Sequence, residues 1–185
     1  NSASVVTDAY LKGVKINGIA TLYEALLHGA NNEGPQATGR KGYAFYNKMG
    51  FVPYNVNIDE SAARTLEYAY DDFSIYQLAK ALNRPAEEIE LYKSRCLNYK
   101  HLFDPETKLM RGKNEDGSFH SPFNPFKWGD EFTEGNSWHY TWSVFHDIEG
   151  LTQLMGGHKS FIAMLDSVFN MPPEFDDSYY GGTIH

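Results

Sequence analysis

Apolar side chains recur every three or four residues along most of the chain, which is the spacing of one face of an α-helix. The clearest run predicts a helix over 59–82, with Asp59 or Ser61 as its cap. Pro85 cannot continue that helix but can open the next one, and the same spacing then predicts a helix over 85–103. We expect these two helices to pack as an antiparallel pair joined by a tight turn.

Shorter runs of the same spacing predict other helices at about 6–14, 21–27, 135–145, 147–155 and 159–169. Residues 31–57 contain several Gly and Pro residues, which indicate a long ordered loop. Turn residues on both sides of Leu109 and Met110 indicate a short β-hairpin or an ordered loop. The predicted fold class is therefore all-α, built from antiparallel helix pairs in series.

The composition adds one positive indication and several exclusions. Aromatic residues make up 15% of the 185 residues, and the net charge is −8. Aromatic faces beside carboxylates suit a carbohydrate site, although aromatic residues also fill the contacts between helices. The acidic balance argues against a general nucleic-acid binder. No segment is apolar over the length of a membrane span, and the first residues show no signal-peptide pattern.

The densest group of chemically useful residues lies in 128–142. Three carboxylates, the last of them Glu134, precede a predicted helix start, and Trp138 and Trp142 then follow at helical spacing with His139 between them. Aromatic rings that exclude water would raise the pKa of a nearby acid, as a proton donor requires. The alternative is that Glu134 caps the helix and both tryptophans lie in the core. Trp138, His139 and Trp142 are weaker candidates for lining a sugar cleft.

Asp71 and Asp72 form a second candidate, because adjacent like charges beside an apolar stripe need a partner or a cleft. Asp72 is our weaker candidate for a sugar contact, and a solvated helix face is the alternative. The sequence has no His-Glu-x-x-His zinc motif and no Gly-x-Ser-x-Gly nucleophile turn. The single cysteine, Cys96, excludes a disulfide within the chain and predicts a small core residue.

Several of these segments, taken in order, resemble glycoside hydrolase family 92. The resemblance is carried by the residues TDAYLKG at 7–13, TLEYAYDDF at 65–73, NYKHLFDPET at 98–107, TEGNSWHYTW at 133–142 and HDIEGL at 146–151. It extends over nearly the whole chain, so it is more specific than any one of these motifs alone.

The resemblance implies an exported, mostly bacterial, calcium-dependent exo-α-mannosidase of α-1,2 type. Such enzymes remove terminal mannose from N-glycans or mannans with inversion. The family's catalytic domain is an (α/α)6 toroid packed on an amino-terminal β-sandwich. Its Thr-Glu-Gly-Asn motif carries the general acid, which falls on Glu134 here. In an inverting mechanism a second carboxylate activates the attacking water.

The sequence departs from the family at two points. Motifs like Gly-Asn-Asp-Asp, for the base, and Gly-Asn-Glu-Pro, for calcium, do not occur, so we assign no metal ligand and expect the calcium ligands outside this chain. The predicted helices are also fewer than six pairs. We therefore expect residues 1–185 to be a partial domain, the amino-terminal to middle part of the toroid, without the β-sandwich or the carboxy-terminal part.

As an isolated chain, such a piece is expected to be inactive and to self-associate through uncovered helix faces. Two other classes stay open at this point. One is a non-catalytic carbohydrate-binding helical module, and the other is a helical interaction scaffold.

Overall fold

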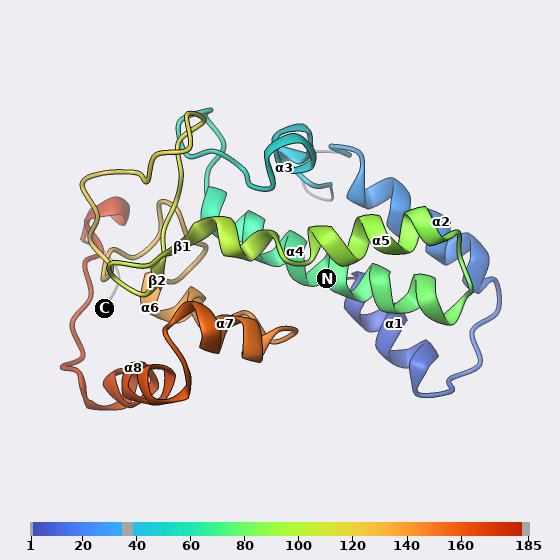
Figure 1. The fold of residues 1–185 in the computed structure, drawn as a ribbon. Coiled ribbons are helices and arrows are strands. Elements are labelled where there is room, and N and C mark those ends of the chain that lie inside the picture. The colour runs from blue at the N-terminus through green and yellow to red at the C-terminus, as the bar shows by residue number, and fades with distance from the viewer. Residues whose placement is uncertain (1, 35–38, 183–185) are drawn as a thin grey trace.

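The computed structural model describes residues 2–34 and 39–182, which are mostly helical (Figure 1). A long helix, α4 (Ser61–Ala81), runs through the middle and packs against helices from both sides of it in the sequence. These partners are α1 (Ser2–Leu11), α2 (Ile19–Ala30), α5 (Ala86–Arg95) and a 3₁₀ helix (Asn98–Leu102).

The predicted antiparallel pair is confirmed as α4 and α5. The turn between them forms where Asn83 adopts a left-handed φ of 52° and the Arg84 N–H donates to the Ala79 carbonyl at 3.0 Å. This arrangement pairs the last carbonyls of α4, which have no partner within the helix. Pro85 then precedes the first residue of α5, as predicted.

The predicted cap of α4 was wrong. Glu60, with a φ of 59°, stands at the cap position, and no side chain caps the helix. The first N–H groups of α4 donate instead to backbone carbonyls of the loop at 129–135. Ala62 and Ala63 both donate to the Glu131 carbonyl, at 3.0 and 3.1 Å. A contact between distant segments thus replaces the local cap that the sequence pattern favoured.

The helix predicted over 85–103 is interrupted. It ends at Arg95, and the chain continues through a turn into the 3₁₀ helix, where Lys100 N–H donates to the Leu97 carbonyl three residues earlier. Tyr92, Cys96 and Tyr99 are nevertheless buried. The apolar spacing therefore predicted correctly which side chains are buried. It did not predict the change from an α-helix to the more tightly wound 3₁₀ helix.

The loop predicted over 31–57 contains a further helix, α3 (Tyr43–Met49). Gly42 and Gly50, in left-handed conformations, stand immediately before and after it, so glycines that indicated a loop mark the ends of a short helix. Part of this segment, 35–38, lies outside the described residues. The first helix also ends earlier than predicted, at Leu11, because Gly13 terminates it with a φ of 82°.

A two-stranded hairpin follows the 3₁₀ helix, as predicted. Strand β1 (Phe103–Asp104) pairs antiparallel with β2 (Leu109–Met110), and Phe103 lies opposite Met110. Asp104 fixes the turn, because its carboxylate accepts from the Glu106 N–H and the Thr107 hydroxyl. The next turn is closed by an isolated pair between Lys113 and Phe119.

Three α-helices follow in the described residues, and a short 3₁₀ helix (Ser178–Tyr180) lies near their end. The one predicted over 135–145 is reduced to a single turn, α6 (Ser137–Tyr140), whereas α7 (Ile148–Leu154) and α8 (His158–Asn170) agree with prediction. Asp147 caps α7, since its side chain accepts from the Gly150 N–H at 3.0 Å. The residues after α8 return to the body of the chain, where Asp176 pairs with Lys127.

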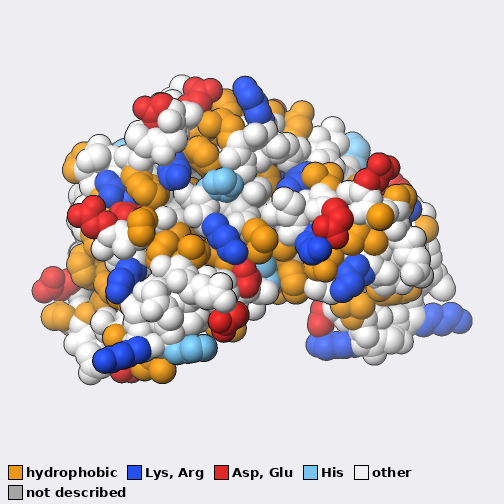
Figure 2. Space-filling view, viewed as in Figure 1, with side chains coloured by type: hydrophobic (Ala, Val, Ile, Leu, Met, Phe, Trp, Pro, Cys, Tyr) orange, Lys and Arg blue, Asp and Glu red, His pale blue; other side chains and the backbone are white. Residues whose placement is uncertain are grey.

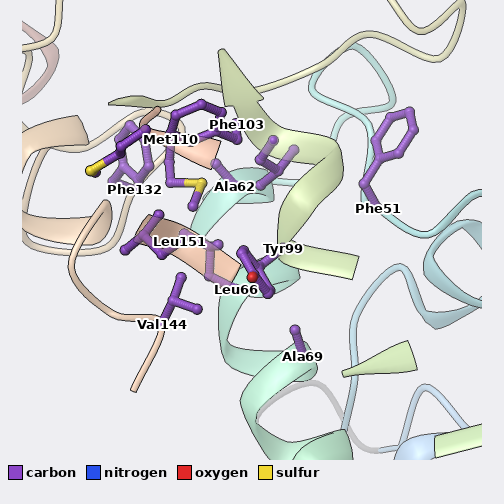
Figure 3. Close-up of a cluster of buried hydrophobic side chains, with 12 residues drawn as sticks. Phe51, Ala62, Leu66, Ala69, Tyr99, Phe103, Met110, Phe132, Val144 and Leu151 are labelled. Carbon is purple, nitrogen blue, oxygen red and sulfur yellow. The ribbon is translucent and has the colours of Figure 1, made fainter. Parts of the chain in front are cut away.

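The main apolar core lies where α4 meets the hairpin and α7. Leu66, Met110 and Leu151 point toward one another there (Figure 3). A second apolar cluster joins α1, α2, α4 and α5 around Tyr23 and Leu78. Between the part that holds α7 and α8 and the part that holds α1, the edge of the molecule is hollowed (Figure 2).

Candidate active site

The loop at 129–135 is closed on itself. The Gly129 N–H donates to the Gly135 carbonyl at 2.8 Å, so the two ends of the loop meet. Three of its residues, Gly129, Asp130 and Glu134, have left-handed φ values of 87°, 61° and 45°. Non-glycine residues rarely adopt this conformation, so the surrounding contacts must hold Asp130 and Glu134 in it.

Those contacts fasten the loop to α4. The Asp130 carbonyl accepts from the Glu60 N–H at 3.0 Å, next to the bonds that the Glu131 carbonyl accepts from α4. On the other side the Tyr140 hydroxyl donates to the Thr133 carbonyl at 2.9 Å, and its ring stacks on Phe132. The loop is therefore a rigid element that joins the start of α4 to α6.

Glu134 lies at the junction of this loop with α6, as the sequence predicted. Its side chain is exposed, and no hydrogen bond or ion pair holds it within the part of the chain that the structure describes. The predicted capping role falls to Asn136 instead, whose side chain accepts from the His139 N–H. Glu134 is thus free of a structural role as a helix cap, and its carboxylate is presented to the outside.

Trp138, His139 and Trp142 come together around one cavity of about 560 Å³. Its walls are mostly apolar and include Trp128 and Phe175. The indole N–H groups of Trp138 and Trp142 are buried and have no hydrogen-bond partner among the described residues. Trp142 also packs edge-on against Phe161 at the margin of the core, so it combines a core contact with a place in the cavity wall. Glu134 is exposed and does not line this cavity, so the water-excluding aromatic surroundings that the sequence suggested for it are not found among the described residues.

Asp72 lies elsewhere. It is completely buried and holds two arginines, with Arg40 Nη1 at 2.7 Å and Arg95 Nε at 2.9 Å, and it accepts from the Tyr46 hydroxyl at 3.1 Å. A side chain with no exposed surface and three partners is not available to a sugar. The structure therefore places Asp72 in a buried ion network that ties α4 to α5 and to the segment before α3, not in a cleft.

A second cavity, of about 300 Å³, borders the loop through Thr133. Arg64, Glu67 and Asp71 line it from one face of α4, and Glu60 lines it from the position just before the helix. Burial raises the pKa of Glu67 and Asp71, and the charge of Asp71 raises that of Glu67 further. One carboxylate oxygen of Asp71, Oδ1, is buried without a partner in the described residues.

Sequence reasoning did not select Glu67 as a site residue. The signal was present, because Glu67 and Asp71 are four apart and share a helix face with Arg64.

The described residues do not provide a calcium site. Over 2–34 and 39–182 no three acidic, histidine or cysteine side chains gather as metal ligands would. Calcium favours six to eight oxygen ligands, so the residues present do not fit it. Within the same residues no helix is both long and apolar enough to cross a membrane.

Several solved structures with the same fold are described as mannosidases. One is a family GH92 inverting mannosidase from Bacteroides thetaiotaomicron, which is 40% identical with a TM-score of 0.86 over 97% of this chain. Another is a family GH92 α-mannosidase from the same organism, which is 37% identical with a TM-score of 0.83 over 92% of this chain. A structure of the latter enzyme with mannoimidazole also matches, at 34% identity and a TM-score of 0.84.

This chain spans about a quarter of the length of these relatives, 24% of the first and 22% of the second. A curated relative, an uncharacterized secreted glycosidase from the fungus Arthroderma benhamiae, is 29% identical over 90% of this chain and 26% of its own length. The match in fold confirms the predicted fold class, antiparallel helix pairs that form part of an (α/α)6 toroid.

The sequence as a whole agrees with these structural matches. Residues 1–184 match the glycosyl hydrolase family 92 catalytic domain, so the match includes every described residue. Together with the shared fold, this extent means that the chain belongs to glycosyl hydrolase family 92.

Proposed function

We propose that this chain is the amino-terminal to middle part of the toroid of an exo-α-mannosidase, and that the complete enzyme removes terminal mannose from glycans with inversion. Glu134 is its general acid. The observation that carries the proposal is the position of Glu134, which lies at the end of a closed loop fastened to α4 and has no structural partner of its own. The similarity to an inverting mannosidase supports the same assignment.

Hydrolysis with inversion needs an acid and a base on opposite sides of the glycosidic bond. Glu134 would donate its proton to the departing oxygen. The carboxylate that activates water, and the calcium ligands, would come from parts of the enzyme outside residues 1–185. A proton donor at neutral pH also needs water to be excluded around it. Because Glu134 is exposed here, the bound sugar and those other parts would supply that exclusion.

The substrate would be a mannose-containing glycan, such as an N-glycan, with α-1,2-linked terminal mannose. The names of the structural relatives support mannose as the sugar. The aromatic cavity formed by Trp138, His139 and Trp142 offers flat faces of the kind that pack on sugar C–H groups. The name of the fungal relative, a secreted glycosidase, supports export of the complete enzyme to the periplasm, the cell surface or the medium.

The test is Glu134→Gln in the complete enzyme, assayed on aryl α-mannosides of increasing leaving-group acidity and on an α-1,2-mannobioside. Loss of a general acid should lower kcat on the mannobioside by about 10²–10⁴-fold, and by much less on the best aryl leaving group, which departs without a proton. Binding of mannose should persist. The anomer released first, followed by NMR, checks inversion.

Glu115→Gln is the matched control, because it removes the same charge from an exposed turn residue and should leave kcat unchanged. Near-wild-type hydrolysis of the mannobioside by Glu134→Gln would exclude Glu134 as the acid. Titration of the isolated chain with mannose oligosaccharides, with and without calcium, tests the other classes. Binding that needs neither calcium nor Glu134 would favour a binding module, and no binding by the complete protein would favour a scaffold.

A further inference from the structure

Glu134 depends on its loop for its position. Its own side chain has no partner in the described part of the chain, and its left-handed backbone is not one that a glutamate adopts by preference. The place from which this side chain starts, and the direction of its Cα–Cβ bond, are therefore fixed by whatever fixes residues 129–135. The backbone bonds to α4 fasten one side of the loop. A side chain of the loop fastens it to a further segment of the chain.

That side chain is Glu131, three residues before Glu134 and 5% exposed. Its Oε2 accepts from the Gly112 N–H at 2.8 Å, and its Oε1 makes a short hydrogen bond with His120 Nδ1. Both partners belong to the segment after the hairpin, which is distant in sequence from the loop. The Glu131 carboxylate thus connects the loop to this segment, while its backbone carbonyl connects the loop to α4.

His120 is itself held in one orientation. Its ring stacks on Tyr54, with the ring centres 3.7 Å apart and the planes at 17°. Its backbone N–H donates to the Gly112 carbonyl at 2.8 Å, and its carbonyl accepts from Arg111 Nε at 3.0 Å. His120 and Gly112 therefore form one rigid unit that presents two donors to the buried Glu131 carboxylate.

A buried carboxylate that loses one of two donors carries a large desolvation cost, so it moves toward water or toward another donor. A movement of Glu131 would carry Glu134 with it, since only two residues separate them. Displacement of a reacting group by about 1 Å can lower a rate by about 100-fold.

We propose that Glu131 and His120 are positioning residues, which hold the loop so that the Glu134 carboxyl group points at the glycosidic oxygen. This inference rests on the proposed role of Glu134 as the acid. It predicts a defect of one kind: proton donation fails, whereas sugar binding and the rest of the chemistry do not.

The experiment uses the complete enzyme and the leaving-group series. His120→Ala should lower kcat by about 100-fold on the α-1,2-mannobioside, by less than about 5-fold on the best aryl leaving group, and change KM by less than about 2-fold. His120→Asn places an amide N–H near the position of Nδ1 and should restore kcat to within about 10-fold of wild type. His120→Gln, which moves the donor outward, should not restore it.

A second route leaves both side chains in place. A Cβ at residue 112 would lie 2.8–3.0 Å from the carboxyl atoms of Glu131, so Gly112→Ala pushes the carboxylate aside. It should reproduce the leaving-group dependence of His120→Ala. Gly29→Ala is the matched control, because a Cβ there meets nothing within 4 Å and should not change kcat. This route remains decisive if His120→Ala fails to fold.

The outcomes separate the two proposals. Equal losses of kcat on every leaving group, or no loss, in His120→Ala and Gly112→Ala would overturn the positioning role, because a merely structural defect lowers all rates alike. If Glu134→Gln itself shows no dependence on the leaving group, the proposed acid is wrong, whatever His120 does. Both proposals are supported if the loss of kcat depends steeply on the leaving group in Glu134→Gln, His120→Ala and Gly112→Ala, and if His120→Asn restores kcat.

Discussion

Helices α4 and α8 carry the same kind of apolar pattern and have opposite surroundings. Twelve of the 21 residues of α4 are buried, and none of the 13 residues of α8 is. α4 packs against α1, α2, α5 and the 3₁₀ helix and also meets the hairpin and α7 in the main core, whereas the main neighbour of α8 is α7. Ile162 and Phe169 on α8 are 56% and 79% exposed. An apolar stripe thus shows which face of a helix needs a partner, but not whether this chain contains that partner.

The difference matters for the interpretation of each helix. On α4, a charged residue beside the apolar stripe must be paired or face a cavity. Asp72 is paired with two arginines, and Asp71 faces a cavity. On α8, charged residues face water and need no partner. Under the proposed function the outer face of α8 would be covered by helices from the rest of the toroid.

The largest effect is expected from Asp72→Ala. Removal of this carboxylate leaves Arg40 and Arg95 buried without their common partner, which should lower the free energy of unfolding by about 3–5 kcal/mol. Asp166→Ala, at an exposed position of α8, should change it by less than about 0.5 kcal/mol. Urea denaturation of both variants measures the contrast. If Asp72→Ala changed the free energy of unfolding only slightly and raised KM in the complete enzyme, Asp72 would instead be a sugar-binding residue.

A smaller effect is expected on self-association of the isolated chain through α8. Replacement of Ile162 and Phe169 by Lys removes two exposed apolar side chains from one helix face and adds charge, so the dissociation constant should rise by at least about tenfold. The control replaces Ala163 and Asn170 by Lys, which adds the same charge one position further round the helix. Sedimentation velocity over a range of concentrations measures both. Equal weakening by the two pairs would attribute the effect to charge alone.

The sequence predicted the pairing of α4 with α5, the hairpin, α7 and α8, because helical spacing and turn residues act over short distances. It failed where a distant contact decided the local structure. The first N–H groups of α4 donate to the Glu131 carbonyl, and no local sequence pattern could predict this distant partner. α3 was missed because seven residues are too few to show a period.

The candidate site divides in the same way. The junction position of Glu134 followed from its place before the predicted helix, and the grouping of Trp138 with Trp142 followed from their helical spacing. His139 was a weaker candidate without a spacing argument, and it lines the same cavity. The environment of Asp72 did not, because Arg40 and Arg95 lie 32 and 23 residues away in the sequence. The same applies to Glu131 and His120, whose partnership depends on how the segment after the hairpin returns to the loop.

The smallest effect concerns Asp71, the second acid of α4. Burial is the main cause that raises its pKa above the usual 3.8. Near and above pH 3.8 the unfolded chain has therefore released a proton that the folded chain still holds. The stability that this carboxyl contributes is present below that pH and is lost as the pH rises through the pKa of the folded state. At neutral pH the charged form of this partly buried carboxyl group is a net cost to the folded state.

Asp71→Asn removes that cost, so we expect the variant to be more stable than the wild type at pH 7, with a gain that shrinks toward pH 4. Urea unfolding of both proteins at several pH values in this range measures the difference. Asp166→Asn on α8 is the matched control, because it makes the same chemical change at an exposed carboxylate. A loss of stability at pH 7 in Asp71→Asn would mean that the Asp71 carboxylate is paired with a cation. The contrast between a partly buried acid on α4 and a solvated one on α8 would then fail, because both carboxylates would be satisfied in the folded state.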